Sequence, residues 1–208
     1  MTERLILPVS DNKEKHETYR NRIAKYNQAM KYEFYCEAIM IAYAMMEDRL
    51  RSMLYHMGFL ANRSATTIWK KTKPFLQNVV EEYKNERESK SLGINSLSSK
   101  MKLIRCIYLW AENIEGGYES SEFAKVLKTQ IEGTDISEVL HILEDIEKWK
   151  GYRNEIVHSM LNKNIDSLEI VLEPHAIDGM RYTRALDAQE RLLKKGNRIR
   201  RKMNLPMD

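Results

Sequence analysis

Three polar side chains late in the sequence have the residue types needed to cleave a phosphodiester. Arg153, Asn154 and His158 lie within the segment Arg-Asn-Glu-Ile-Val-His. An arginine offers a two-pronged donor to phosphate oxygens, and a histidine, which titrates near neutral pH, can move a proton to or from a hydroxyl. An asparagine amide can hold the imidazole ring or a phosphate oxygen. These groups suffice in kind for metal-free RNA cleavage, in which the 2′-hydroxyl itself attacks.

Helical spacing brings two of these side chains together. At about 100° per residue, Asn154 and His158 lie about 40° apart around an α-helix, and Arg153 lies about 140° from His158. Apolar residues, among them Ile156 and Val157, lie between and beside them. The polar groups are therefore expected to border a packed stripe, where a phosphodiester site is plausible.

An arginine and a histidine at this spacing do not by themselves indicate a catalytic site, since Arg51 and His56 have the same spacing. The asparagine directly after Arg153 distinguishes the first pair, and we interpret the second pair as structural. A structural alternative also stays open for the first pair, in which Arg153 forms a surface ion pair with Glu147 or Glu155.

The Arg-Asn-x-x-x-His pattern, on a late helix of a helix-rich chain, resembles the HEPN family. That family's motif is an arginine, four to six residues and a histidine, very often with asparagine after the arginine. The resemblance extends from about Lys31 to Leu161. It implies a helical bundle that dimerises so that two motifs meet in one cleft. Many members are metal-independent ribonucleases of toxin–antitoxin or antiviral systems, and others bind nucleotides or partner proteins without cutting.

For this chain the resemblance implies an endoribonuclease, active as a homodimer, that leaves 2′,3′-cyclic phosphate and 5′-hydroxyl ends. Arg153 would bind the scissile phosphate, His158 would act as general acid and base, and Asn154 would orient one of them. An antitoxin or regulatory protein is an expected partner. Met160 stands where toxins paired with nucleotidyltransferase antitoxins usually have tyrosine, which argues against control by modification of that tyrosine. The alternative is a non-catalytic module that binds a nucleotide or a partner protein.

Other common chemistries have no sequence support. None of the five histidines forms an HxxH or HExxH pair, so we expect no metal site and no cofactor. Walker A, GxGxxG and GxSxG patterns are missing, and the two cysteines form no CxxC pair. The N-terminus lacks the apolar region of a signal peptide, and no apolar run is long enough to span a membrane. These features predict a cytoplasmic protein.

Positive charge is concentrated near the C-terminus. Between Arg181 and Lys202 there are nine basic and two acidic residues, a net charge of +7, so the remainder carries −3 of the total of +4. Such a patch suits a phosphate backbone. One alternative is that these charges belong to a solvated terminal helix that binds nothing. Another is that the protein is a helical scaffold that binds nucleic acid nonspecifically through this segment, in which case deletion of residues 181–208 would abolish binding. The residues predicted to bind RNA are Arg181, Arg184, Arg191, Lys194, Lys195 and Arg198.

The elements that must position these residues are expected to be helices, because the chain has few helix breakers, 8 Gly and 4 Pro. We predict an all-α, HEPN-like bundle at 31–165, after a lead-in helix at 1–30 and before a short extended segment and basic helix at 166–208. A wide apolar stripe predicts a core helix over 31–57, ended by Gly58, with Glu47, Asp48 and Arg49 at its solvated edge. The other predicted helices cover 12–30, 65–71, 75–87, 100–114, 121–131, 134–161 and 174 onward, with a linker at 88–99 and an extended segment at 168–172.

Overall fold

The helical elements follow one another along the chain with no β-strand among the residues that the structure describes, which confirms the predicted all-α class. The structure, a computed structural model, describes residues 12–116, 121–159, 165–196 and 198–205; for residues 12, 13, 15, 155–159 and 165–169 it describes the backbone alone. The helices are α1 (Asn12–Lys31), α2 (Tyr35–His56), α3 (Lys73–Tyr83), α4 (Leu97–Asn113), α5 (Glu122–Ile131), α6 (Ile136–Ser159), α7 (Ile165–Gly196) and α8 (Arg198–Lys202).

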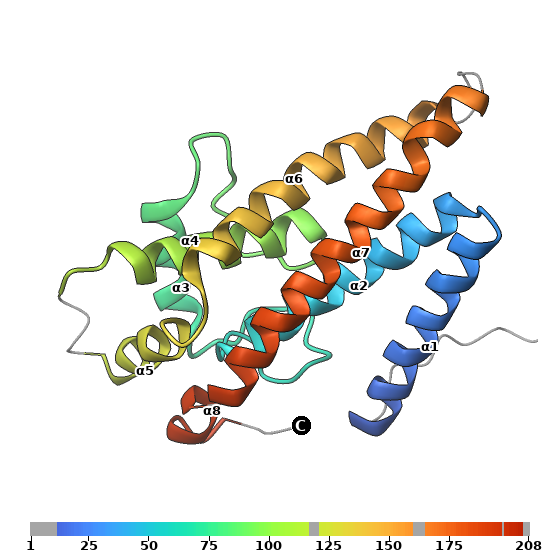
Figure 1. The fold of residues 1–208 in the computed structure, drawn as a ribbon. Helices are drawn as coiled ribbons and strands as arrows, with labels where there is room; N and C mark the ends of the chain where they lie inside the picture. The colour runs from blue at the N-terminus through green and yellow to red at the C-terminus, as the bar shows by residue number, and fades with distance from the viewer. Residues whose placement is uncertain (1–11, 117–120, 160–164, 197, 206–208) are drawn as a thin grey trace, which may run out of the picture.

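Helix α2 is the central element of the core. It packs against α7, α4 and α1 (Figure 1), and α6 packs against both α4 and α7. The stripe that predicted a core helix is buried, with Ala42, Met46, Leu50 and Met53 fully inaccessible. Their i, i+4, i+8, i+11 spacing keeps them on one face, so burial of that face stabilises the helix. Gly58 has φ +82° directly after the helix, as a C-terminal glycine requires.

The predicted extended segment at 168–172 is helical instead, and α7 begins at Ile165, before Pro174. Proline inside a helix removes one hydrogen bond. Helical spacing of Leu172, Ala176 and Met180, all buried, explains why the helix continues, because packing against α2 offsets the local cost of the proline. Figure 1 shows α6 and α7 antiparallel and side by side where α6 ends and α7 begins, with α7 then crossing α2.

Capping residues set several helix boundaries. Ser96, not Ser98 or Ser99, caps α4, and Ser99 completes a capping box with it. Asp135 caps α6 by accepting a hydrogen bond from the amide of Glu138 at 2.9 Å. The helix predicted at 65–71 does not form, since turns occupy this segment. There the amide of Trp69 donates to the carbonyl of Phe59 at 2.9 Å.

The basic C-terminal segment belongs to the core. Leu186, Leu193 and Ile199 are fully buried, and α8 packs against α5. The described residues of 166–208 are therefore part of the bundle, and α7 packs against α2 in its core.

Candidate functional site

The predicted site lies on α6, in the half of the helix that runs beside the first turns of α7 (Figure 1). Arg153 is half-buried and Asn154 is exposed. His158 lies in the last turn of α6, and its side chain is outside the described residues. The structure thus describes two of the three predicted side chains.

Arg153 rests on an aromatic ring and pairs with none of the acidic side chains that the structure describes. Its Cζ atom lies 4.4 Å from the centroid of the Tyr43 ring of α2. Within the part of the chain that the structure describes, it forms no ion pair or hydrogen bond, and its buried Nε atom is unpartnered. The face of an aromatic ring attracts a cation without neutralising it, so Arg153 keeps its charge and its donors for an anion.

A histidine from α7 borders this arginine. The His175 ring stacks on Trp149, with centroids 4.7 Å apart and planes 6° apart. Trp149 Nε1 donates to the His175 carbonyl oxygen at 2.8 Å. Burial lowers the pKa of His175, Asp178 partly opposes this, and the nearby charge of Arg153 lowers the pKa by a smaller amount, so that it lies at about 4. His175 is therefore neutral at neutral pH, as burial of a charged group would require a partner.

Gly179 makes the approach of α6 to α7 possible. A Cβ atom at this position would lie 2.8 Å from Trp149 Cζ2 and 3.1 Å from Ala42 Cβ. Contacts that short force neighbouring atoms to move, so the glycine lets the indole lie flat against α7 beneath His175.

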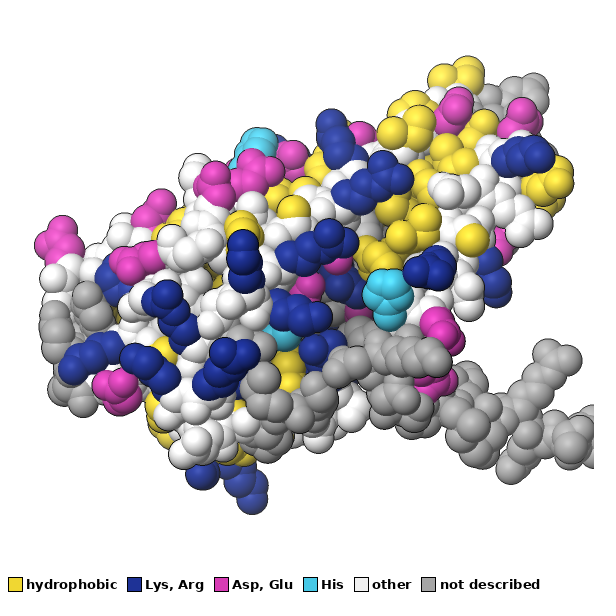
Figure 2. Space-filling view, turned by 60° about the horizontal axis from the view of Figure 1, so that its bottom comes forward, with side chains coloured by type: hydrophobic (Ala, Val, Ile, Leu, Met, Phe, Trp, Pro, Cys, Tyr) yellow, Lys and Arg dark blue, Asp and Glu magenta, His cyan; other side chains and the backbone are white. Residues whose placement is uncertain are grey.

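All six residues predicted to bind RNA are exposed on α7 and α8. Two of them form surface ion pairs, Arg181 with Asp178 at 3.1 Å and Arg191 with Asp187 at 2.7 Å. Figure 2 shows Lys and Arg side chains spread over this face, beside an apolar area. We call the six residues together the basic face: Arg181, Arg184, Arg191, Lys194, Lys195 and Arg198.

The two acids of this segment point into the protein. Glu190 accepts hydrogen bonds from Ser52 at 2.7 Å and His56 at 2.9 Å, and Asp187 accepts one from Arg49 at 3.0 Å. Burial raises the pKa of Glu190, but these hydrogen bonds and the charges of His56 and Arg49 lower it to about 2. Glu190 therefore has internal partners alone among these contacts, whereas Asp187 also pairs with Arg191 of the basic face.

The second arginine–histidine pair, Arg51 and His56, has hydrogen-bond partners inside the protein. His56 is 1% exposed and bound to Glu190, and Arg51 donates to the Ala65 carbonyl at 3.4 Å. Both have internal partners, as expected for a structural pair. Arg49, expected at the solvated edge of its helix, is buried instead, with its guanidinium 4.2 Å from the Tyr19 ring.

Arg200 is buried and is not part of the basic surface. It is 1% exposed and donates to the carbonyl oxygens of Tyr55, Leu60 and Ala61 at 2.9–3.0 Å. The Tyr55 carbonyl lies in the last turn of α2 and the other two follow its end, so Arg200 binds acceptors at a helix terminus. Nothing in its sequence neighbourhood distinguishes it from the exposed arginines beside it, except that Ile199 marks the buried side of this turn.

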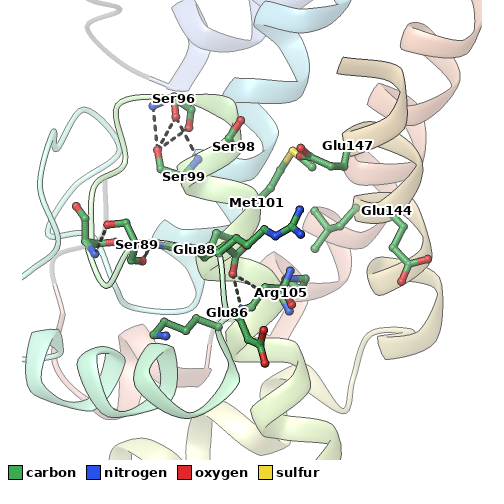
Figure 3. Close-up of a pocket in the computed structure, with 16 residues that line it drawn as sticks. Glu86, Glu88, Ser89, Ser96, Ser98, Ser99, Met101, Arg105, Glu144 and Glu147 are labelled. Carbon is green, nitrogen blue, oxygen red and sulfur yellow. Dashed lines mark hydrogen bonds and ion pairs between the residues drawn. The ribbon is translucent and has the colours of Figure 1, made fainter. Parts of the chain in front are cut away.

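A separate pocket of about 1090 Å³ lies between the segment after α3, the start of α4 and α6 (Figure 3). Its lining includes four basic and four acidic side chains, so the charges cancel. Arg105 is paired with Glu88, and Lys102 donates to the carbonyl of Ser89 at 2.9 Å. This pocket therefore does not extend the basic face.

Comparison with known proteins adds no assignment to what the residues indicate. Among the described residues, no helix is long and apolar enough to cross a bilayer, and no three His, Cys, Asp or Glu side chains gather as a metal site. Searches against family models, curated proteins and solved structures found no match.

Proposed function

We propose that this chain is a HEPN-like, metal-independent endoribonuclease. The observation that supports it most is the state of Arg153, which stacks on Tyr43 and pairs with no acid among the side chains that the structure describes. It directly precedes the exposed Asn154 on α6, and His158 follows one turn later. A guanidinium with no acidic partner among the described side chains, in one helical segment with an asparagine and a histidine, is a combination that a structural helix does not need and that phosphodiester cleavage does.

The reaction proceeds by transesterification within the RNA. The ribose 2′-oxygen attacks the phosphorus as its proton passes to a base, and the bond to the 5′-oxygen breaks as that oxygen receives a proton. Arg153 binds the phosphate oxygens, where negative charge builds up in the transition state. His158 moves the protons, and Asn154 orients the imidazole or the phosphate. The products are a 2′,3′-cyclic phosphate and a 5′-hydroxyl.

A homodimer would place two copies of His158 in one cleft, so that one imidazole serves as base and the other as acid. Large apolar side chains exposed near the site support such an interface, since exposed apolar areas of this kind often mark protein contacts. They come from α6, α7 and the start of α2, and Figure 2 shows an apolar area next to the basic face. The residues are Phe34, Met40, Tyr152, Ile170, Val171 and Ile177.

The basic face supplies the remaining RNA contacts. From His175, beside the site, α7 continues to Gly196, and at about 1.5 Å per residue this stretch is about 30 Å long. A strand bound at Arg153 can therefore continue along exposed cations. The proposal includes a role as a toxin or antiviral component, restrained by an antitoxin or regulatory protein.

Overexpression in a bacterial host tests the activity. We expect the wild type to arrest growth and His158→Ala to permit it. His141→Ala is the matched control, because His141 lies exposed on the same helix; it should arrest growth like the wild type. Arrest by the His158→Ala protein, at equal expression, would contradict the assignment.

The same guanidinium also suits a module that binds a nucleotide or partner protein without cutting. In that case overexpression has no effect on growth, while Arg153→Ala still abolishes phosphate-dependent binding.

A further inference from the structure

Two buried nitrogen atoms beside the site have no hydrogen-bond partner within the described part of the chain, Nε of Arg153 and Nε2 of His175. A buried polar atom without a partner loses the hydrogen bonds it made to water and gains none in return. Such atoms are uncommon in folded proteins, and each calls for a structural reason.

The two side chains that carry these atoms are neighbours. Trp149 and Arg153 are one turn apart on α6, so they project on the same side of the helix. His175 stacks on Trp149, which places its ring beside Arg153, close enough for the arginine charge to act on its pKa.

The two atoms are also chemically complementary. The Arg153 Nε–H group can only donate a hydrogen bond, whereas Nε2 of a neutral imidazole accepts one when the proton sits on Nδ1. His175 is neutral because it is buried. Its ring is fixed by the stack on Trp149 and by the bond from Trp149 Nε1 to its carbonyl, so the acceptor is held in place before any ligand arrives.

We propose that His175 is a positioning residue for Arg153: when a phosphate binds, the Arg153 Nε–H donates to His175 Nε2, while Tyr43 supports the flat face of the guanidinium. The two terminal nitrogens then remain for the phosphate oxygens. This inference rests on the proposed function, in which Arg153 binds the scissile phosphate. Because the acceptor on His175 is already held in place, less freedom is lost when the arginine becomes fixed on binding.

A double-mutant cycle tests the coupling. The probe is a fluorescent 2′-O-methyl RNA oligonucleotide, which no 2′-hydroxyl attack can cleave. His175→Phe is expected to weaken its binding about tenfold, the loss of one hydrogen bond to a charged group. Arg153→Ala should weaken it more, because this change also removes the nitrogens that bind the phosphate. Because His175 acts through Arg153, the double variant should bind no more weakly than Arg153→Ala alone.

His175→Phe keeps an aromatic ring against Trp149 and removes the acceptor, and His175→Gln, which restores an acceptor, should bind within about threefold of the wild type. Wild-type affinity of His175→Phe beside a weakened Arg153→Ala would overturn this inference and leave the proposed function standing, as would losses that multiply in the double variant. Wild-type affinity of Arg153→Ala would overturn both.

A measurement on the wild type needs no variant. The Nε–H proton of Arg153, observed by NMR, should shift and become protected from exchange when the oligonucleotide is added. An unchanged resonance in the saturated complex would also overturn the inference.

Discussion

Arg153 and His175 show how the fold sets the state of a single side chain. The flat face of the arginine lies against Tyr43, and no acid among the described side chains pairs with it. The histidine keeps its neutral form because Trp149 and the body of α7 bury it. A charged arginine can donate to a histidine only if the histidine is neutral, and burial keeps His175 neutral.

His175 should make stability depend on pH. Its pKa in the folded protein, about 4, lies below the ordinary value of 6.5, so the unfolded chain binds a proton first as the pH falls. The contribution is complete above pH 6.5 and is lost as the pH falls towards 4, by about 3 kcal/mol. Urea unfolding at several pH values should therefore show a steeper loss for the wild type than for His175→Phe. Parallel pH profiles of the two proteins would contradict the assigned burial of His175.

At the scale of elements, the close contact between α6 and α7 requires a glycine at position 179. Gly179→Ala should destabilise the protein by about 1–3 kcal/mol, because the new Cβ meets Trp149 at 2.8 Å. Gly151→Ala is the matched control on α6, where nothing lies within 4 Å of the added atom. It should stabilise the protein by up to about 1 kcal/mol, since alanine favours a helix. Denaturant unfolding measures both, and equal effects of the two substitutions would refute this account of the helix contact.

Apolar periodicity was enough to predict the core helices, because burial of one face decides their formation. The stripe ending at Gly58 gave α2 to within a few residues, and Ser121 correctly marked the start of α5. Local signals failed where long-range packing opposes them. Pro174 suggested a helix start, yet Leu172 and Ala176 pack on either side of it.

The candidate site was predictable in part for the same reason. Residue type and spacing identified Arg153, Asn154 and His158, since these lie in one segment. Tyr43 and His175 come from α2 and α7, far away in the sequence, and no local pattern links them to the motif. Burial of Arg49 and Arg200 likewise depends on carbonyls and acids that the fold brings from distant segments.

For the whole molecule, the basic segment has two separate roles. One side of α7 and α8 is core, with Leu193 and Ile199 fully buried and Arg200 bound to carbonyls, and the opposite side is the basic face. Deletion of residues 181–208 would therefore remove part of the core together with the cations. Substitution of exposed residues is the way to separate binding from folding.

Lys194→Ala with Lys195→Ala should weaken RNA binding and lower the slope of log affinity against log salt by about 0.7 for each phosphate that the protein no longer neutralises. Arg87→Ala with Lys90→Ala removes the same charge from the exposed segment between α3 and α4 and should change the slope little. Fluorescence anisotropy at several salt concentrations measures both. If the two double variants bind RNA with equally reduced affinity, the net charge and not the basic face governs binding.

The most direct test of the whole account is cleavage of total RNA in EDTA by purified wild type, His158→Ala and His141→Ala. The account predicts that the wild type and His141→Ala cut the RNA, leaving 2′,3′-cyclic phosphate and 5′-hydroxyl ends, while folded His158→Ala leaves it intact. Equal cutting by His158→Ala, or no cutting by the wild type, would contradict it.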